Sequence, residues 1–118
     1  MNMRNTLLML AICLVSGPVI SAPPALHSPR PGVLCDSYIC ADGQGISRRL
    51  TSQYLGQVRG DKLRAMGAFD TQAFTFEGGV FCDVRARLCR DDRYFGPDGK
   101  RSGAINKHYT QLLFGGHP

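Results

Sequence analysis

The chain has 118 residues, a formal net charge of +5 at pH 7 and five cysteines. This length allows one small domain and excludes a large multidomain enzyme. The basic balance allows partners that carry negative charge, although most basic surfaces of this strength are simply solvated.

The first residues predict export. A single basic residue, Arg4, precedes the unbroken apolar run LLMLAICLV at residues 7–15, and small residues follow at Ser21 and Ala22. This order is typical of a secretory signal peptide. The apolar run is far shorter than the roughly 20 residues that a membrane-spanning helix needs. We therefore predict a signal peptide over residues 1–21, no transmembrane segment after its cleavage, and no nucleic-acid partner for a chain sent out of the cytoplasm.

Residues 22–31 follow the predicted cleavage site and hold four prolines. Proline-rich segments adopt extended conformations and act as spacers. We predict an extended tether here, followed by a single domain over residues 32–118.

Four cysteines remain after the signal peptide: Cys35, Cys40, Cys82 and Cys89. An even number in a short exported chain predicts disulfides, with three possible connectivities. The stretch VLCDSYICAD at residues 33–42 is written again, in similar form, as VFCDVRARLCRD at 80–91. If these are equivalent units, each closes on itself and gives Cys35–Cys40 and Cys82–Cys89. A hairpin centred on residues 85–86 would also place Cys82 directly opposite Cys89.

A four-thiolate zinc site is the alternative reading of the same cysteines. Zinc sites usually space their cysteine pairs two to four residues apart, whereas four and six residues lie between the cysteines here. An oxidising compartment also works against free thiolates. We expect neither a metal nor a cofactor.

The similarity of the two stretches continues beyond the cysteines. Each is followed by an Asp-Gly turn and then by ISRRLTSQYLG at residues 46–56 or INKHYTQLLFG at 105–115. Ser47 and Asn106 are suitable helix N-caps, and a glycine ends each segment where a left-handed residue is favoured. We predict an α+β fold of two pseudo-repeated units, each a disulfide-braced loop or hairpin followed by a short helix. Chance similarity between short segments is the alternative.

The sequence between the units predicts shorter elements. Residues 61–66 suggest one or two helical turns with Asp61 as the N-cap, which accounts for the RGD tripeptide at 59–61 without a recognition role. Residues 73–76 alternate as a strand, and 77–79 form a tight turn into the second cysteine unit. Residues 90–95 are expected to continue the second hairpin until GPDG at 96–99 ends it.

Several stretches together resemble the YcgJ family, also called Fels-1 prophage protein-like: GVLCDSYICAD, GISRRLT with YLG, FDTQAFTFEGGVFCDVRARLCRDDRYFGPDGKRSGAIN and YTQLLFG. They cover most of residues 32–115. The resemblance implies a small exported protein of Gram-negative bacteria, hence a periplasmic destination. It supplies no catalytic or binding residues.

Catalytic motifs of known type do not occur in the sequence. The aspartates lie mostly in expected loops and turns; those at equivalent places in the two units, Asp36 with Asp83 and Asp42 with Asp98, indicate turn geometry rather than catalysis. DDRYFG at residues 91–96 lacks the alternating oxygen ligands of a calcium loop. A small periplasmic hydrolase that uses loop aspartates stays open as the alternative function.

The densest polar run, residues 85–101, predicts the binding surface. Arginine beside aromatic residues is typical of recognition surfaces. The predicted binding residues are Arg85, Arg87, Arg90, Arg93, Tyr94, Lys100 and Arg101. The alternative is that these arginines pair locally with Asp91, Asp92 and Asp98. We predict a non-enzymatic binding or interaction module that recognises a periplasmic protein or an anionic envelope component.

Overall fold

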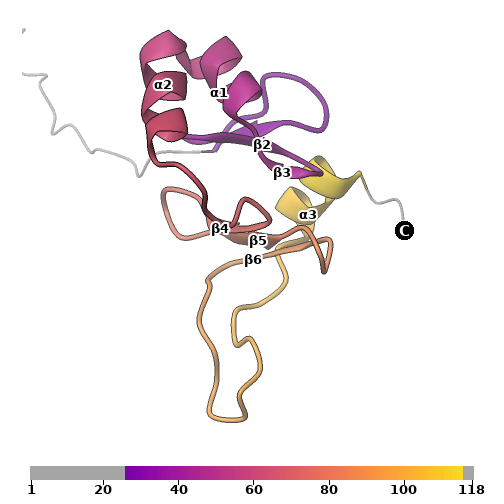
Figure 1. Ribbon diagram of the computed structural model, residues 1–118. Helices are drawn as coiled ribbons and strands as arrows, with labels where there is room; N and C mark the ends of the chain where they lie inside the picture. The colour runs from indigo at the N-terminus through magenta and orange to yellow at the C-terminus, as the bar shows by residue number, and fades with distance from the viewer. Residues whose placement is uncertain (1–25, 116–118) are drawn as a thin grey trace, which may run out of the picture.

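The computed structural model describes residues 26–115, which fold into three helices and two three-stranded antiparallel sheets (Figure 1). This is the α+β fold class that the sequence predicts. The predicted signal peptide and residues 22–25 of the predicted tether lie outside the described residues. The elements in chain order are β1 Leu34–Cys35, β2 Cys40–Asp42, β3 Gly45–Ile46, α1 Arg48–Leu55, α2 Gln57–Ala65, β4 Ala73–Thr75, β5 Phe81–Asp83, β6 Leu88–Arg90 and α3 Lys107–Phe114. None of the helices in this part of the chain is long and apolar enough to cross a membrane.

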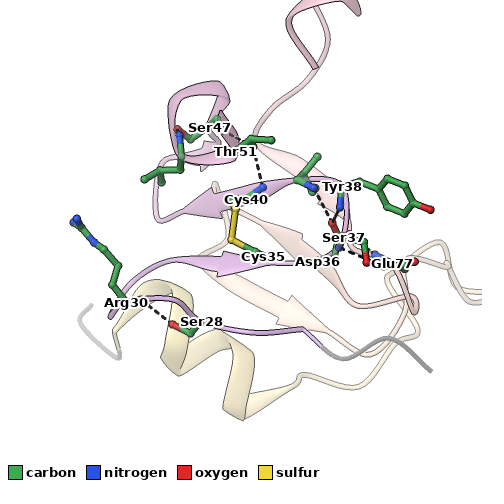
Figure 2. The surroundings of a disulfide bond; sticks show 12 residues. Ser28, Arg30, Cys35, Asp36, Ser37, Tyr38, Cys40, Ser47, Thr51 and Glu77 are labelled. Atoms are coloured by element: carbon green, nitrogen blue, oxygen red, sulfur yellow. Dashed lines mark hydrogen bonds between the residues drawn. A yellow bond between two sulfur atoms is a disulfide. The ribbon is translucent and has the colours of Figure 1, made fainter. Parts of the chain in front are cut away.

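The first sheet has the strand order β1-β2-β3 and carries the first disulfide. Cys35 lies directly opposite Cys40 in the β1–β2 register, and the two are bonded (Figure 2). Side chains alternate between the faces of a strand, so the neighbouring pair Leu34 and Ala41 points to the other face. One face of this sheet therefore meets α1, and the opposite face meets the second half of the chain.

The second sheet has the order β4-β5-β6 and carries the second disulfide in the same way. Cys82 lies opposite Cys89 across the β5–β6 hairpin and is bonded to it. Both predicted cysteine pairings are thus confirmed, and all four cysteines are fully buried. Because the bridges close short loops, each is expected to add stability near the low end of the usual range of about 2–4 kcal/mol.

The main hydrophobic core lies where both sheets and α3 come together. Its buried side chains are Leu34, Ala41, Phe74, Phe76, Cys82, Cys89, Leu113 and Phe114. A smaller cluster fills the space between the first sheet and α1, from Val33, Cys35, Cys40 and Leu50. The second sheet contributes only one face to the core, which leaves its other face for the loop that follows β6.

Each helix that follows a disulfide unit is tied to the second cysteine of that unit. In the first half, the backbone N–H of Ser47 donates to the Cys40 carbonyl at 2.9 Å, and the Cys40 N–H donates to Thr51 Oγ1 at 3.0 Å (Figure 2). The Ser47 side chain caps α1 by accepting from the Leu50 N–H. The predicted N-cap is confirmed, and it is locked to the disulfide.

The second half has the same bonds at the corresponding residues. The Asn106 N–H donates to the Cys89 carbonyl at 2.8 Å, and the Cys89 N–H donates to Thr110 Oγ1 at 2.8 Å. Asn106 caps α3 through the Tyr109 N–H, and Gly115 ends the helix in the left-handed conformation. The duplication of the two units is an interpretation of the sequence. The structure adds one observation to it, the matching hydrogen bonds at corresponding residues.

Replacing Thr51 by valine should lower the free energy of unfolding by about 2 kcal/mol, because the isosteric change leaves the buried Cys40 N–H without an acceptor. The same change at Thr110, which is only half-buried, should cost about 1 kcal/mol. Urea unfolding of the two variants, followed by circular dichroism, measures both losses. A larger loss at Thr110 than at Thr51 would contradict this account.

The segment after α1 differs from the prediction. The second helix, α2, begins at Gln57 with Gly56 as its N-cap, so the prediction that Asp61 is an N-cap is wrong. Gly56 has φ 99°, which lets the chain turn directly from one helix into the next. Gly60 is buried against α1, where an added Cβ would lie 1.7 Å from Ser52 Oγ. The RGD tripeptide therefore lies within a helix with its glycine covered.

The end of the predicted tether joins the first sheet. His27 pairs with Cys35 through two backbone hydrogen bonds, N–H to carbonyl, of 2.9 and 2.8 Å. His27 therefore supplies the outer edge of β1 with a partner.

Candidate binding surface

A long excursion of the chain after β6 forms the most prominent surface feature. We call residues 90–105 the projecting hairpin. Its two sides are joined by the isolated bridges Arg90 with Ile105 and Phe95 with Arg101. Figure 1 shows it extending away from both sheets, at the end of the molecule opposite α2. The predicted turn at residues 96–99 lies at its tip, where the Gly99 N–H donates to the Gly96 carbonyl at 3.0 Å.

The base of the projecting hairpin closes around a glycine. Gly103 is buried, and a Cβ added there would lie 2.6 Å from the backbone oxygen of Asp92 on the opposite side. The Asp91 N–H donates to the Ala104 carbonyl at 2.9 Å next to this contact. Only glycine allows the two sides to approach so closely, which makes the hairpin narrow and fixes its direction.

Arg101 joins the projecting hairpin to the second sheet. Its guanidinium carbon lies 4.2 Å from the centre of the Phe81 ring and 4.1 Å from that of the Phe95 ring. It also donates a hydrogen bond to the Arg93 carbonyl. Phe81 points away from the core, because its neighbour Cys82 points into it, yet Phe81 is buried. The Arg101 side chain is therefore a structural brace as well as a basic residue.

Two further predicted binding residues have internal partners. Arg87 donates to the Phe114 carbonyl at 3.1 Å and lies over the Phe114 ring, 5.1 Å from its centre. Arg90 donates to the Gly103 carbonyl at 2.8 Å. These contacts tie Arg87 to α3 and Arg90 to the base of the projecting hairpin.

Arg85 lies away from the rest of the predicted set. It is in the turn between β5 and β6, as Arg87 is, whereas the projecting hairpin leaves from the far end of the β5–β6 ladder. Arg85 pairs with Asp70 at 3.5 Å, and both side chains are more than half exposed, so the pair adds little to stability. The hydrogen bond from the Gln72 backbone N–H, with a further contribution from Arg85, holds the pKa of Asp70 below its ordinary value.

The remaining predicted residues, Arg93, Tyr94 and Lys100, do gather near the tip of the projecting hairpin. Tyr94 is 60% exposed and Phe95, beside it, 61%. The Arg93 guanidinium lies 5.5 Å from the centre of the Tyr94 ring, and Lys100 is exposed on the opposite side of the turn. We call Arg93, Tyr94, Phe95 and Lys100 the tip cluster.

Exposed apolar side chains are concentrated in this hairpin. Of the six large hydrophobic side chains that are exposed in the described residues, three lie within it: Tyr94, Phe95 and Ile105. Phe95 and Ile105 are absent from the set that the sequence predicts. Phe95 could have been included from the sequence, because it lies inside the basic run and follows Tyr94.

The acidic residues of the projecting hairpin form no salt bridge with the basic side chains of the tip cluster. Asp92 accepts from the Tyr94 backbone N–H and Asp98 from the Lys100 N–H, both at 3.0 Å. Asp91 accepts from the Asn106 side chain at 2.9 Å. Among the described residues, the salt bridges join only Arg64 to Asp61 and Arg85 to Asp70. The alternative of local ion pairs within the run is therefore wrong for these side chains.

The predicted turn role of the repeated aspartates is confirmed. Asp36 and Asp83 each accept from backbone N–H groups two and three residues ahead. Asp42 and Asp98 each accept from the N–H two residues ahead, across an Asp-Gly turn.

The surface formed by residues 26–115 has no pocket. This part of the chain also holds no group of three His, Cys, Asp or Glu side chains placed to bind a metal ion. The exposed side chains of the tip cluster lie on a convex projection. The arrangement suits contact with a large partner and offers no enclosed site for a small molecule.

The fold and this surface define a class: a small, disulfide-braced α+β domain that presents a projecting hairpin. The chain belongs to the YcgJ family, whose model, described as YcgJ protein, matches residues 26–114. It is 55% identical over 89 residues to a protein of Escherichia coli (strain K12) named "Uncharacterized protein YcgJ", which covers 75% of this chain and 73% of that protein. No solved structure matches this chain. The resemblance stated from the sequence is confirmed, and the relative's name assigns no activity.

Proposed function

We propose that the protein is a periplasmic, non-enzymatic binding module that uses the tip cluster to recognise a protein or an anionic component of the envelope. The observation that carries the proposal is the exposure of Tyr94 and Phe95 beside two basic side chains without acidic partners. Solvent-exposed aromatic residues next to arginine are the side chains that most often dominate recognition.

Rigidity supports the same proposal. The projecting hairpin starts at a buried disulfide and is braced by Arg101 and Gly103. A braced element loses little conformational entropy on binding, so more of the contact energy appears as affinity. A flexible basic tail of the same composition would lose this advantage.

The location rests on the sequence and the cysteine pairing. The first 21 residues have the pattern of a signal peptide. The two disulfides suit an oxidising compartment. The YcgJ family resemblance adds the expectation of the periplasm.

Photo-cross-linking in cells tests the proposal. A benzophenone amino acid in place of Tyr94 should give one dominant adduct, whereas the same group in place of Val58, which is 72% exposed on α2, should give none. Arg93→Ala should weaken the adduct about tenfold without moving the thermal midpoint, because the Arg93 side chain is exposed.

Arg87→Ala is the matching structural control. It removes contacts with Phe114 in the core, so it should lower the thermal midpoint and leave the adduct of the folded protein unchanged. Equal adducts from positions 94 and 58, or none from position 94, would contradict the proposal.

A further inference from the structure

We infer that the partner of the tip cluster is the anionic surface of a phospholipid bilayer, bound at the level of the headgroups. The inference rests on the proposed function and narrows its partner to one class. The contacts would be headgroup phosphates on Arg93 and Lys100, with the rings of Tyr94 and Phe95 in the interfacial layer. Amphipathic aromatic rings favour this layer, and basic side chains are attracted to anionic headgroups.

Shape is the first argument. Tyr94 and Phe95 are consecutive residues in the paired part of the projecting hairpin, so their side chains leave opposite faces. Their rings accordingly contact different arginines, Arg93 and Arg101. A flat, rigid protein surface would cover one of these faces. Mobile headgroups can surround both.

Charge is the second argument. The carboxylates of Asp92 and Asp98 accept backbone N–H groups, which leaves Arg93 and Lys100 without a salt bridge. Lys107 is also exposed and follows the base of the hairpin. The basic side chains therefore remain available to phosphate groups, in a chain whose formal charge is +4 once the predicted signal peptide, which holds Arg4, is removed.

The acidic residue at the tip of the projecting hairpin limits how deeply the hairpin can enter the bilayer. Residues 96–100 read GPDGK, so a carboxylate, Asp98, lies at the far end of the hairpin. Burying this charge in hydrocarbon would be costly. The hairpin is therefore expected to stop among the headgroups, and its binding should be weakened by salt.

Flotation of the purified protein with vesicles tests the inference. Vesicles of phosphatidylglycerol and phosphatidylethanolamine should carry the protein at low salt, and phosphatidylcholine vesicles should not. Added inorganic phosphate at matched ionic strength should leave the binding unchanged, because a single free anion does not reproduce the bilayer surface. Salt at 0.5 M, as a chosen condition, should release most of the protein.

Charge-matched variants locate the contact. Arg93→Gln with Lys100→Gln should weaken vesicle binding roughly 30-fold, about 2 kcal/mol at 1.4 kcal/mol per factor of ten. Arg49→Gln with Lys62→Gln removes the same charge from exposed positions on α1 and α2 and should change it less than threefold. Tyr94→Ser should weaken binding more than Val58→Ser, and thermal unfolding verifies that all four proteins are folded.

The outcomes separate the two proposals. Equal losses from both charge variants, or equal binding to both kinds of vesicle, would overturn the lipid inference. If vesicles fail to bind while the position 94 cross-linker captures a protein or a glycan, the lipid inference is wrong and the proposed function stands. If vesicles fail and position 94 gives no adduct, both are wrong.

Discussion

Replacing Asp36 by alanine should lower the free energy of unfolding by about 3–5 kcal/mol. Asp36 is buried, and its Oδ1 accepts from the backbone N–H groups of Tyr38 and Ile39 at 2.7 and 2.8 Å. Its Oδ2 accepts from the Glu77 N–H at 2.6 Å, from a turn in the other half of the chain (Figure 2). Alanine leaves three donors without an acceptor and removes a link between the two sheets.

Asp83→Ala is the matched control, because Asp83 holds the corresponding place after Cys82. Its bonds go to Arg85 and Ala86 alone, at 2.9 and 3.4 Å, in an exposed turn. Its loss should cost about 1 kcal/mol. Urea unfolding of both variants gives the comparison, and equal losses would show that the bond to Glu77 adds nothing.

Asp36→Asn separates the two sets of bonds. The amide oxygen can still serve Tyr38 and Ile39, but the amide nitrogen would meet the Glu77 N–H, donor against donor. Its loss of stability should fall between those of Asp36→Ala and Asp83→Ala. A loss no greater than that of Asp83→Ala would indicate that the turn bonds alone matter at Asp36.

The parts of the fold that the sequence predicts correctly depend on residues close together in the chain. Cys82 and Cys89 pair because the hairpin between them is short, and Ser47 and Asn106 cap their helices through an N–H three residues ahead. The start of α2 was missed because Gly56 serves as the end of one helix and the cap of the next. No helix stop signal of usual length separates them.

The candidate site was predicted only in part, for the same reason. Its position in the chain follows from composition, since basic and aromatic residues are dense between 85 and 101. Which arginines are free depends on distant partners. Arg87 meets Phe114, 27 residues away, and Arg101 meets Phe81, 20 residues away. Neither contact leaves a periodic pattern in the sequence.

These contacts divide similar basic residues into those with partners inside the fold and those without them. Arg90 and Arg101 stabilise the projecting hairpin through a carbonyl and ring contacts, and Arg87 contacts α3 at the other end of the β5–β6 ladder. Arg93 and Lys100 lie beyond the base of the projecting hairpin and are exposed. Composition alone gives all five the same role, and only their partners in the folded chain distinguish them.

The second large effect is expected at Gly45, where the first sheet meets the segment that leads into β4. Gly45 is buried with φ +120°, and an added Cβ would lie 2.2 Å from the Thr71 backbone oxygen. That oxygen accepts from the Ile46 N–H at 2.9 Å. The obstacle is therefore a fixed backbone atom, and Gly45→Ala must separate the two segments or break this hydrogen bond.

Gly45→Ala should accordingly cost about 4 kcal/mol or more, the sum of a backbone clash and an unfavourable φ. Gly32→Ala is the control, because Gly32 also has a positive φ, +82°, but nothing lies within 4 Å of an added Cβ. It carries the conformational cost alone, about 1–2 kcal/mol. Urea unfolding gives both values, and hydrogen exchange of the Ile46 amide reports the junction directly. Fast exchange at Ile46 in the Gly45 variant, with normal exchange in the Gly32 variant, is the expected result. Similar losses and similar exchange in both would mean that the junction with Thr71 can move apart freely, so that it does not hold the two halves together.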